Sequence, residues 1–322
     1  MVAIRVFIGI AFGAQILERD IMKWLCVLLT VFTATSARAE LNVVASLPDF
    51  GAIAEAIGGS AVKVTTIARG SEDPHFVDAR PSFVRVLNRA DLLIEGGADL
   101  EIGWLPTLVT AARNPKIQGA GRGHLALAPA IKVLDVPAQP VDRSMGDVHT
   151  GGNSHFWLDP RNGKILAEKI ATALSALDPT NADFFRKNLA DFNDRLDAKW
   201  SEWQKKMEPA RGTKMITYHK SYEYLAQAFG LEIVGQLEPK PGIEPSATHI
   251  NQLAQSAKSA GVKWVVIEPF RPRRSAEQLA KAIGAQVVIL PDKTGSTPEA
   301  GDYFEMFDSI VKQLTGAPAP AK

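Results

Sequence analysis

The chain has 322 residues, with 36 basic and 35 acidic side chains and a formal net charge of +1. This balance, without a basic stripe interleaved with aromatic residues, argues against a nucleic-acid-binding protein. The only cysteine is Cys26, so an intrachain disulfide framework is excluded and stability must come from a large buried core. The length is enough for two domains of ordinary size.

The N-terminus has the pattern of a secretory signal peptide. Residues 22–39, MKWLCVLLTVFTATSARA, give a basic start, an apolar run and small residues at the end. The run is too short to span a bilayer. We expect residues 1–39 to be removed by cleavage before Glu40, and Met22 is a candidate for the natural start. Because Cys26 lies within the run, the mature protein should contain no cysteine and reside in the periplasm.

Beyond residue 40, short β-branched runs alternate with helical patterns. The runs are LNVVAS (41–46), VKVTTI (62–67), DLLIEG (91–96), KMITY (214–218), LEIVG (231–235), KWVVIE (263–268) and QVVILP (286–291). Continuous apolar strands separated by helices indicate parallel sheets covered on both faces. The sequence therefore predicts an α/β fold with two lobes, residues 40–178 and 209–315, each a mostly parallel sheet flanked by helices.

The alternation stops between about residues 163 and 208, where the sequence is helical almost throughout and broken once near Asp178. After the break, apolar side chains recur along one helical face: Phe185, Leu189, Phe192, Leu196, Trp200 and Trp203. This pattern predicts one long connecting helix over residues 179–208, packed across both lobes. Residues 316–322, GAPAPAK, are predicted to be a disordered tail.

Three histidines and one aspartate are the candidate ligands of a metal ion. His75 lies in SEDPHFVDARPSF, His155 in GGNSHFWLDP, His219 in MITYHKSYEYLAQAFG and Asp292 in VVILPDKTGS. The intervals between them are far too long for a local ligand motif, so the fold would have to assemble the site. His219 and Asp292 follow predicted strands directly, and His75 follows another after a loop. Ligands of open α/β sheets bind at these carboxyl ends, which favours a shared site.

Several sequence blocks carry a family resemblance over residues 41–315. They are SLPDF (46–50), Pro74-His75 followed by PSFVRVLNRADLLIEGGADLEIGW, NSHFWLDP (153–160), DPTNADFFRKNLADFNDRL (178–196), TYHKSYEYLAQAFGL (217–231) and DYFEMFDSIV (302–311). In this order they resemble the zinc- and manganese-binding solute receptors of ABC importers, the ZnuA-like and TroA-like proteins.

The resemblance implies two α/β lobes joined by one long helix, with the metal in the cleft between them. His75 and His155 would be the ligands from the N-terminal lobe, and His219 and Asp292 those from the C-terminal lobe. It also implies a monomeric receptor whose partners are an inner-membrane ABC permease and its ATPase. A periplasmic metallochaperone is a further candidate partner.

The chain departs from the family pattern near His155. It has Asn153-Ser154-His155 where relatives commonly have Asn-Pro-His, a change that should leave the imidazole in place. Many zinc receptors carry a long loop rich in His and Asp ahead of this block. Here there is only DRSMGDVHTGGN, with Asp147 and His149, so a metal-collecting loop and a plain surface loop both stay open.

The fourth ligand is also open at this stage. Glu268, at the end of KWVVIE, is the alternative to Asp292, and Glu72 is a candidate accessory ligand or hydrogen-bonding partner of a ligand. Three imidazoles and one carboxylate suit Zn(II), whereas manganese prefers more oxygen ligands. Manganese receptors of this family typically have a carboxylate where His219 stands.

With these residues, the resemblance implies a zinc receptor and not an enzyme, with a Mn(II) or Fe(II) receptor of the same family as the alternative. A secreted zinc hydrolase is the alternative from another class. If Asp292 were a base and not a ligand, three histidines would leave an open position on the metal. No HExxH motif or nucleophile elbow accompanies them in the sequence.

Overall fold

The computed structural model describes residues 40–119, 121–139 and 149–316. The predicted signal peptide, Asp147 and residues 317–322 of the predicted tail lie outside the described residues. Residues from Glu40 onward form a compact unit of their own. Within the described residues, no helix has both the length and the apolar character needed to cross a membrane.

The first half of this unit contains a four-stranded parallel sheet in the order β2-β1-β3-β4. Its strands are β1 (Leu41–Ala45), β2 (Val62–Thr66), β3 (Leu92–Glu95) and β4 (His124–Ala126). The helices beside it are α2 (Pro48–Gly58), α3 (Pro81–Asn88) and α4 (Leu105–Ala112). Each helix has a proline in its first two positions, where the fixed φ of proline suits helix initiation and its missing N–H costs no intrahelical bond.

Strand β4 was absent from the sequence expectations. It has three residues and pairs only with β3, at the edge of the sheet. A strand this short, with a single partner, lacks the β-branched run that marks the other strands. The remaining seven strands fall within two residues of the predicted ranges.

The second half contains another four-stranded parallel sheet, in the equivalent order β6-β5-β7-β8. Its strands are β5 (Lys214–Thr217), β6 (Glu232–Gln236), β7 (Trp264–Ile267) and β8 (Gln286–Ile289). The helices are α7 (Glu223–Phe229), α8 (Ala247–Lys258), α9 (Arg273–Ile283) and α10 (Tyr303–Gly316), so α10 ends one residue beyond the expected end of the lobe. Ser246 caps α8, its Oγ accepting a hydrogen bond from the backbone N–H of His249 at 3.2 Å.

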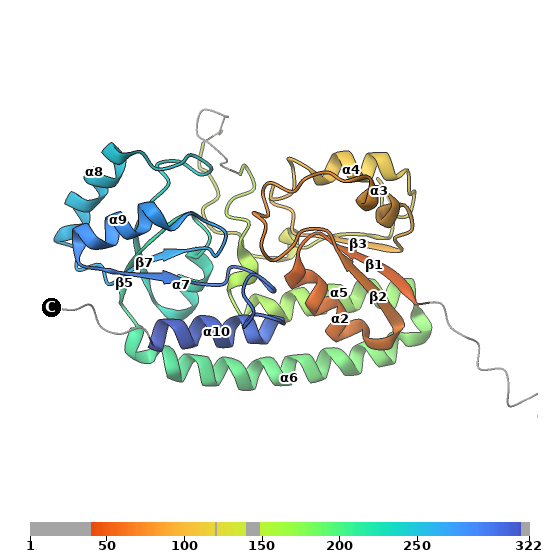
Figure 1. Ribbon diagram of the computed structural model, residues 1–322. Helices are drawn as coiled ribbons and strands as arrows, with labels where there is room; N and C mark the ends of the chain where they lie inside the picture. The colour runs from red at the N-terminus through yellow and green to blue at the C-terminus, as the bar shows by residue number, and fades with distance from the viewer. Residues whose placement is uncertain (1–39, 120, 140–148, 317–322) are drawn as a thin grey trace, which may run out of the picture. The chain divides into compact units, whose positions relative to one another are not determined.

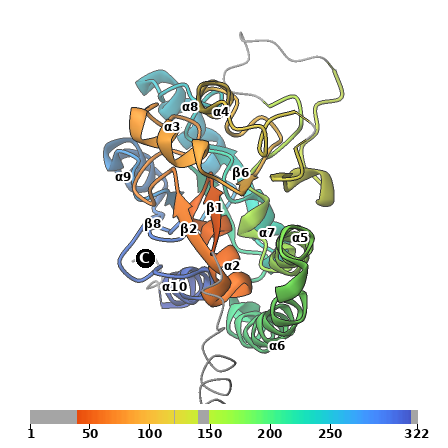
Figure 2. The same cartoon turned by 90° about the vertical axis from the view of Figure 1, so that its right-hand side faces the viewer.

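Two helices connect the sheets. Helix α5 (Asn162–Leu177) leads through a short 3₁₀ turn into α6 (Ala182–Met207), which has 26 residues. Helix α6 contacts α5, α2 and α10, with α2 toward its N-terminal end and α10 toward its C-terminal end, and Figure 1 shows it running beneath both halves. Figure 2 shows α5 lying directly above α6, with which it is in contact. Two parallel four-stranded sheets with a long helix between them confirm the predicted fold class.

The hydrophobic core holds the two halves together. The larger of the two core clusters includes β1 and β3, passes through α5 and α6, and reaches Tyr222, Trp264 and Phe304 of the second half. The smaller cluster, with Ile216 and Leu279, lies within the second half alone.

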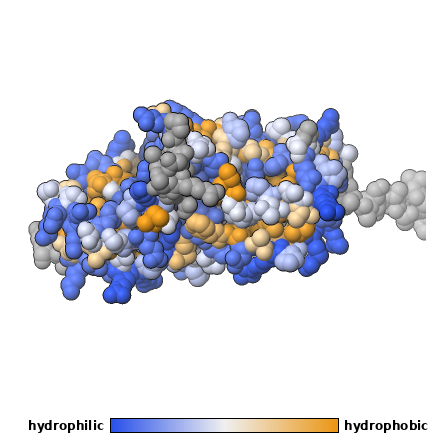
Figure 3. All heavy atoms as spheres, turned by 90° about the horizontal axis from the view of Figure 1, so that it is seen from above, coloured by the Kyte–Doolittle hydropathy of each residue, from blue (hydrophilic) through white to orange (hydrophobic). Residues whose placement is uncertain are grey.

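The face drawn in Figure 3 is mainly hydrophilic, with small hydrophobic groups between the polar residues.

Candidate metal centre

His75, His155 and His219 come from three different elements and are all buried. His75 lies in the loop after β2, His155 directly precedes the 3₁₀ turn Phe156–Leu158, and His219 follows the carboxyl end of β5. In the second sheet the two central strands are β5 and β7. The chain passes from β5 to β6 on one side of the sheet and from β7 to β8 on the other. A ligand site at this end of the strands is the arrangement that open α/β sheets favour.

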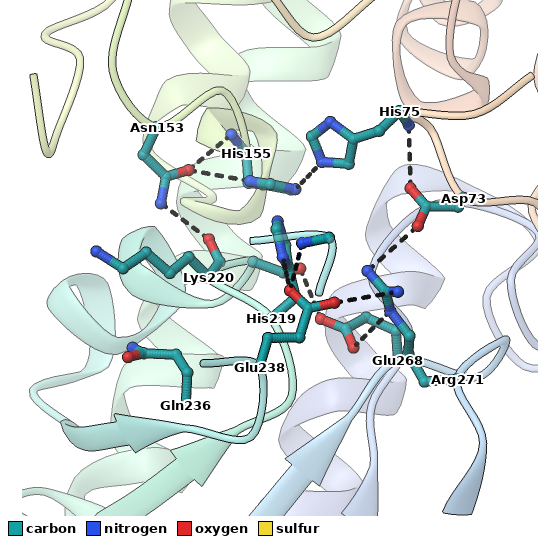
Figure 4. Close-up of polar contacts among 12 residues, drawn as sticks. Asp73, His75, Asn153, His155, His219, Lys220, Gln236, Glu238, Glu268 and Arg271 are labelled. Atoms are coloured by element: carbon teal, nitrogen blue, oxygen red, sulfur yellow. Dashed lines mark hydrogen bonds and ion pairs between the residues drawn. The ribbon is translucent and has the colours of Figure 1, made fainter. Parts of the chain in front are cut away.

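The three imidazoles converge on one point (Figure 4). Each offers a ring nitrogen, and these three atoms lie within 4.8 Å of one another. Nε2 of His75 is 3.2 Å from Nε2 of His155. Two nitrogens bound to one tetrahedral zinc at 2.0 to 2.1 Å are about 3.3 Å apart. The donor set and its spacing therefore fit a zinc ion without rearrangement of these two rings.

Two of the rings are oriented by hydrogen bonds to their other nitrogen. Nδ1–H of His219 donates to Oε2 of Glu238 at 2.6 Å, and Nδ1–H of His155 donates to Oδ1 of Asn153 at 3.0 Å. Both bonds leave Nε2 of the ring as the lone-pair donor, the arrangement usual for metal-binding histidines. Nδ1 of His75 has no hydrogen-bond partner among the described residues. The His75 ring stacks on His149, with centroids 5.0 Å apart and planes 16° apart.

The electrostatics keep two imidazoles neutral. Burial, followed by the neighbouring histidines, lowers the pKa of His75 and of His155 well below 6.5. Burial also opposes the charged form of His219, but the hydrogen bond and the charge of Glu238 outweigh it and raise its pKa. Neutral imidazoles present the lone pairs that a divalent cation needs.

The structure places the two candidate carboxylates beside this group and not within it. In the described residues the group of ligand atoms contains the three histidines alone, without Asp292 or Glu268. Oδ2 of Asp292 accepts a hydrogen bond from Nζ of the fully buried Lys293 at 2.6 Å, and its Oδ1 is buried without a hydrogen-bond partner in the described part of the chain. Oε1 of Glu268 accepts from the Ser221 hydroxyl at 2.6 Å.

The two candidate accessory residues, Glu72 and His149, have different neighbours: Glu72 contacts arginines, whereas His149 contacts His75. Glu72 forms an ion pair with Arg80, Oε1 to Nη2 at 3.4 Å, and its Oε2 accepts from the backbone N–H of Arg69. Glu72 is therefore engaged by neighbouring arginines. His149 lies beside the group through its stacking on His75. With His155 and His219, His149 also lines a pocket of about 110 Å³, large enough for an ion with water.

Four residues support the group in roles that were not predicted from the sequence: Asp73, Asn153, Glu238 and Arg271. Glu238 comes just after the carboxyl end of β6, a position that could have marked it. Asn153 stands two residues before His155 in the block that carries the family resemblance. The contacts of Asp73 and Arg271 join segments far apart in the chain, and no local pattern signals them.

Residues 43–317 match the family model described as "Zinc-uptake complex component A periplasmic". The chain is 26% identical over 316 residues to the high-affinity zinc uptake system protein ZnuA of Paracoccus denitrificans, covering 87% of this chain and 93% of that protein. It is 27% identical over 293 residues to the manganese ABC transporter substrate-binding lipoprotein PsaA of Streptococcus pneumoniae, covering 87% and 91%.

A solved structure shows the same architecture. The crystal structure of a zinc-bound deletion mutant of ZnuA superimposes with a TM-score of 0.72 at 26% identity, covering 88% of this chain and all of that one. The family model spans most of the described chain, and the resemblance inferred from the sequence is confirmed. The chain belongs to the zinc-uptake complex component A periplasmic family, the ZnuA-like metal-binding solute receptors of ABC importers.

Proposed function

We propose that this chain captures Zn(II) in the periplasm and delivers it to an ABC permease for import. The observation that carries the proposal is the convergence of His75, His155 and His219, from both halves of the fold, within reach of one ion. The comparisons support a metal receptor more broadly, because relatives named for zinc and for manganese match similar shares of the chain.

Zinc is favoured over manganese by the donor atoms. Three imidazole nitrogens form a borderline set that suits tetrahedral zinc, whereas Mn(II) prefers oxygen ligands. The proposed ligands are His75, His155 and His219, with Asp292 as the fourth. Asp292 would bind the ion through its buried Oδ1, which has no hydrogen-bond partner in the described ranges. Its Oδ2 accepts a hydrogen bond from Lys293.

Capture proceeds by replacing water with ligands from both halves. The Nδ1 hydrogen bonds of His155 and His219 hold their rings so that Nε2 faces the ion. Because no single half carries all the ligands, the ion binds fully only when the halves are together. Release therefore requires a partner that separates them. The proposed partner is a permease with its ATPase at the inner membrane. The receptor itself takes up the ion directly or from a periplasmic metallochaperone.

Competition binding tests this proposal. Metal-stripped protein lacking residues 1–39 is titrated with zinc or manganese against a chelator of known affinity. We expect one zinc site that binds more tightly than manganese, and a loss of at least about 100-fold in zinc affinity for His219→Ala. His249→Ala is the matched control, because this histidine lies outside the ligand group.

The same titration decides the fourth ligand. Weakening by Asp292→Ala, with little change for Glu268→Ala, supports Asp292. The reverse result assigns Glu268. Zinc binding indifferent to both carboxylates would leave an open three-histidine site, and ester hydrolysis by the zinc form would then have to be measured. Tighter manganese than zinc binding in the wild type would contradict the proposed cargo.

A further inference from the structure

A single guanidinium lies among three carboxylates next to the histidine group (Figure 4). Nη1 of Arg271 is 3.2 Å from Oε1 of Glu238, and Nη2 is 3.2 Å from Oδ2 of Asp73. Nε is 3.9 Å from Oε2 of Glu268. Asp73 belongs to the loop after β2 in the first half, whereas Arg271 follows β7 in the second. The Asp73–Arg271 ion pair therefore joins the two halves.

Two of these carboxylates also hold candidate ligands, through their second oxygen. Oε2 of Glu238 accepts from Nδ1–H of His219 at 2.6 Å. Oδ1 of Asp73 accepts from the backbone N–H of His75 at 3.0 Å. A continuous chain of contacts thus runs from His75 through Asp73, Arg271 and Glu238 to His219, linking a candidate ligand of one half to a candidate ligand of the other.

The surroundings make these contacts stronger than surface ion pairs. The side chains of Arg271, Asp73 and Glu238 are 16%, 15% and 3% exposed. The guanidinium also lies 5.2 Å from the ring centroid of Tyr218 and 5.1 Å from that of Phe270. In such partly dry sites, charge-assisted hydrogen bonds are screened less than at the surface, and removing one partner leaves a buried charge uncompensated.

We propose that Arg271 is a positioning residue that clamps the His75 loop to the His219 side of the centre and thereby sets the rate at which the bound cation leaves. This inference rests on the proposed function. The ion cannot be released until the halves separate, and separation breaks the Asp73–Arg271 pair. A permease that opens the receptor must overcome this pair as well as the metal–ligand bonds.

The test is a double-mutant cycle on zinc dissociation, followed by stopped-flow transfer to excess chelator. Asp73→Asn retains Oδ1 for the His75 N–H but removes the charge facing Arg271. Arg271→Lys keeps the charge but loses the planar fork that reaches two carboxylates. We expect each single variant to raise the dissociation rate about tenfold or more, and the double variant to be no faster than the faster single one.

Arg274→Lys is the matched control, since Arg274 is exposed on α9 and its replacement should leave the rate unchanged. The melting temperature of each metal-free variant is measured in parallel. A purely structural role would lower it without the non-additive change in dissociation rate. Wild-type rates in both single variants, or strictly additive effects in the double variant, would overturn the inference alone. Failure of the wild type to bind any divalent cation would overturn the proposed function and this inference together.

Discussion

At the scale of single residues, Asp49 is a buried acid that joins the two halves. It lies in the first turn of α2, and its Oδ1 accepts hydrogen bonds from the backbone N–H and the hydroxyl of Thr294, at 3.0 and 3.1 Å. Burial raises its pKa from 3.8 to about 7, although the Thr294 hydrogen bonds oppose the shift, and the neighbouring Asp292 adds to it. The carboxyl group is thus held largely protonated in mildly acidic solution.

This acid makes stability depend on pH. Its pKa is higher in the folded chain than in the unfolded one, so its stabilising contribution is complete below about pH 4 and is lost as the pH rises through about 7. Asp49→Asn removes the titration and keeps Oδ1. We expect its stability relative to the wild type to increase from pH 5 to pH 8, by about 2 to 3 kcal/mol. Thermal unfolding of the metal-free proteins across this range measures it, and a pH-independent difference would contradict the assignment.

At the scale of elements, α6 is the packing platform for both halves. Phe192 contacts Phe304 of α10 with ring centroids 5.1 Å apart, and Trp203 contacts Phe307 at 5.2 Å. Near the other end, Nδ2 of Asn188 donates to the Ile57 carbonyl of α2 at 2.9 Å. The apolar stripe read from the sequence is therefore the side of the helix that enters the shared core.

Trp203 tests the contribution of this helix. It is fully buried, and its Nε1–H donates to Oδ1 of Asp308 at 2.8 Å. We expect Trp203→Ala to lower the free energy of unfolding by about 3 to 5 kcal/mol, because it opens a cavity in the core and removes the indole hydrogen bond to Asp308, which is left with its ion pair to Lys199. The neighbouring exposed Gln204→Ala should change it by less than about 0.5 kcal/mol. Chemical denaturation compares the two, and equal effects would remove α6 from the shared core.

At the scale of the described molecule, the two halves share one core and meet closely around the centre. The indole Nε1–H of Trp157 donates to the Asp292 carbonyl at 2.8 Å, and the Tyr303 hydroxyl donates to the Trp157 carbonyl at 3.0 Å. A Cβ on Gly70 would lie 2.1 Å from the carbonyl carbon of Gly295, so the two backbones are in direct contact. Such a joint permits only small relative movement of the halves.

Zinc should stabilise the protein because it binds the folded chain. Because the halves are in close contact, the size of the molecule should change little when zinc binds. At a free zinc concentration 1,000 times the dissociation constant, we expect about 4 kcal/mol of added stability, seen as a higher melting temperature that a chelator reverses. Small-angle scattering of the metal-free and zinc-loaded forms should give nearly equal radii of gyration. A hinge closure of several ångströms would contradict the shared-core description.

Much of this architecture follows from the sequence. The β-branched runs mark seven of the eight strands in the described part of the chain, and the stripe from Phe185 to Trp203 marks the long helix, because both patterns record local periodicity and burial. Strand β4 escaped because three residues at a sheet edge carry too little pattern. His75, His155 and His219 could be proposed together because strand ends and recognisable blocks identify each of them.

Local sequence patterns were thus enough to predict the α/β class and the two-sheet arrangement, and to name three histidines that the fold brings together. The surroundings of these histidines could be seen only in the folded protein: Asp292 is paired with Lys293, Glu238 and Asn153 orient two of the rings, and Arg271 reaches Asp73 across the halves. The physical reason is that periodicity is a property of neighbouring residues. Hydrogen bonds and ion pairs between distant segments depend on distances of a few ångströms, which exist only once the chain has folded.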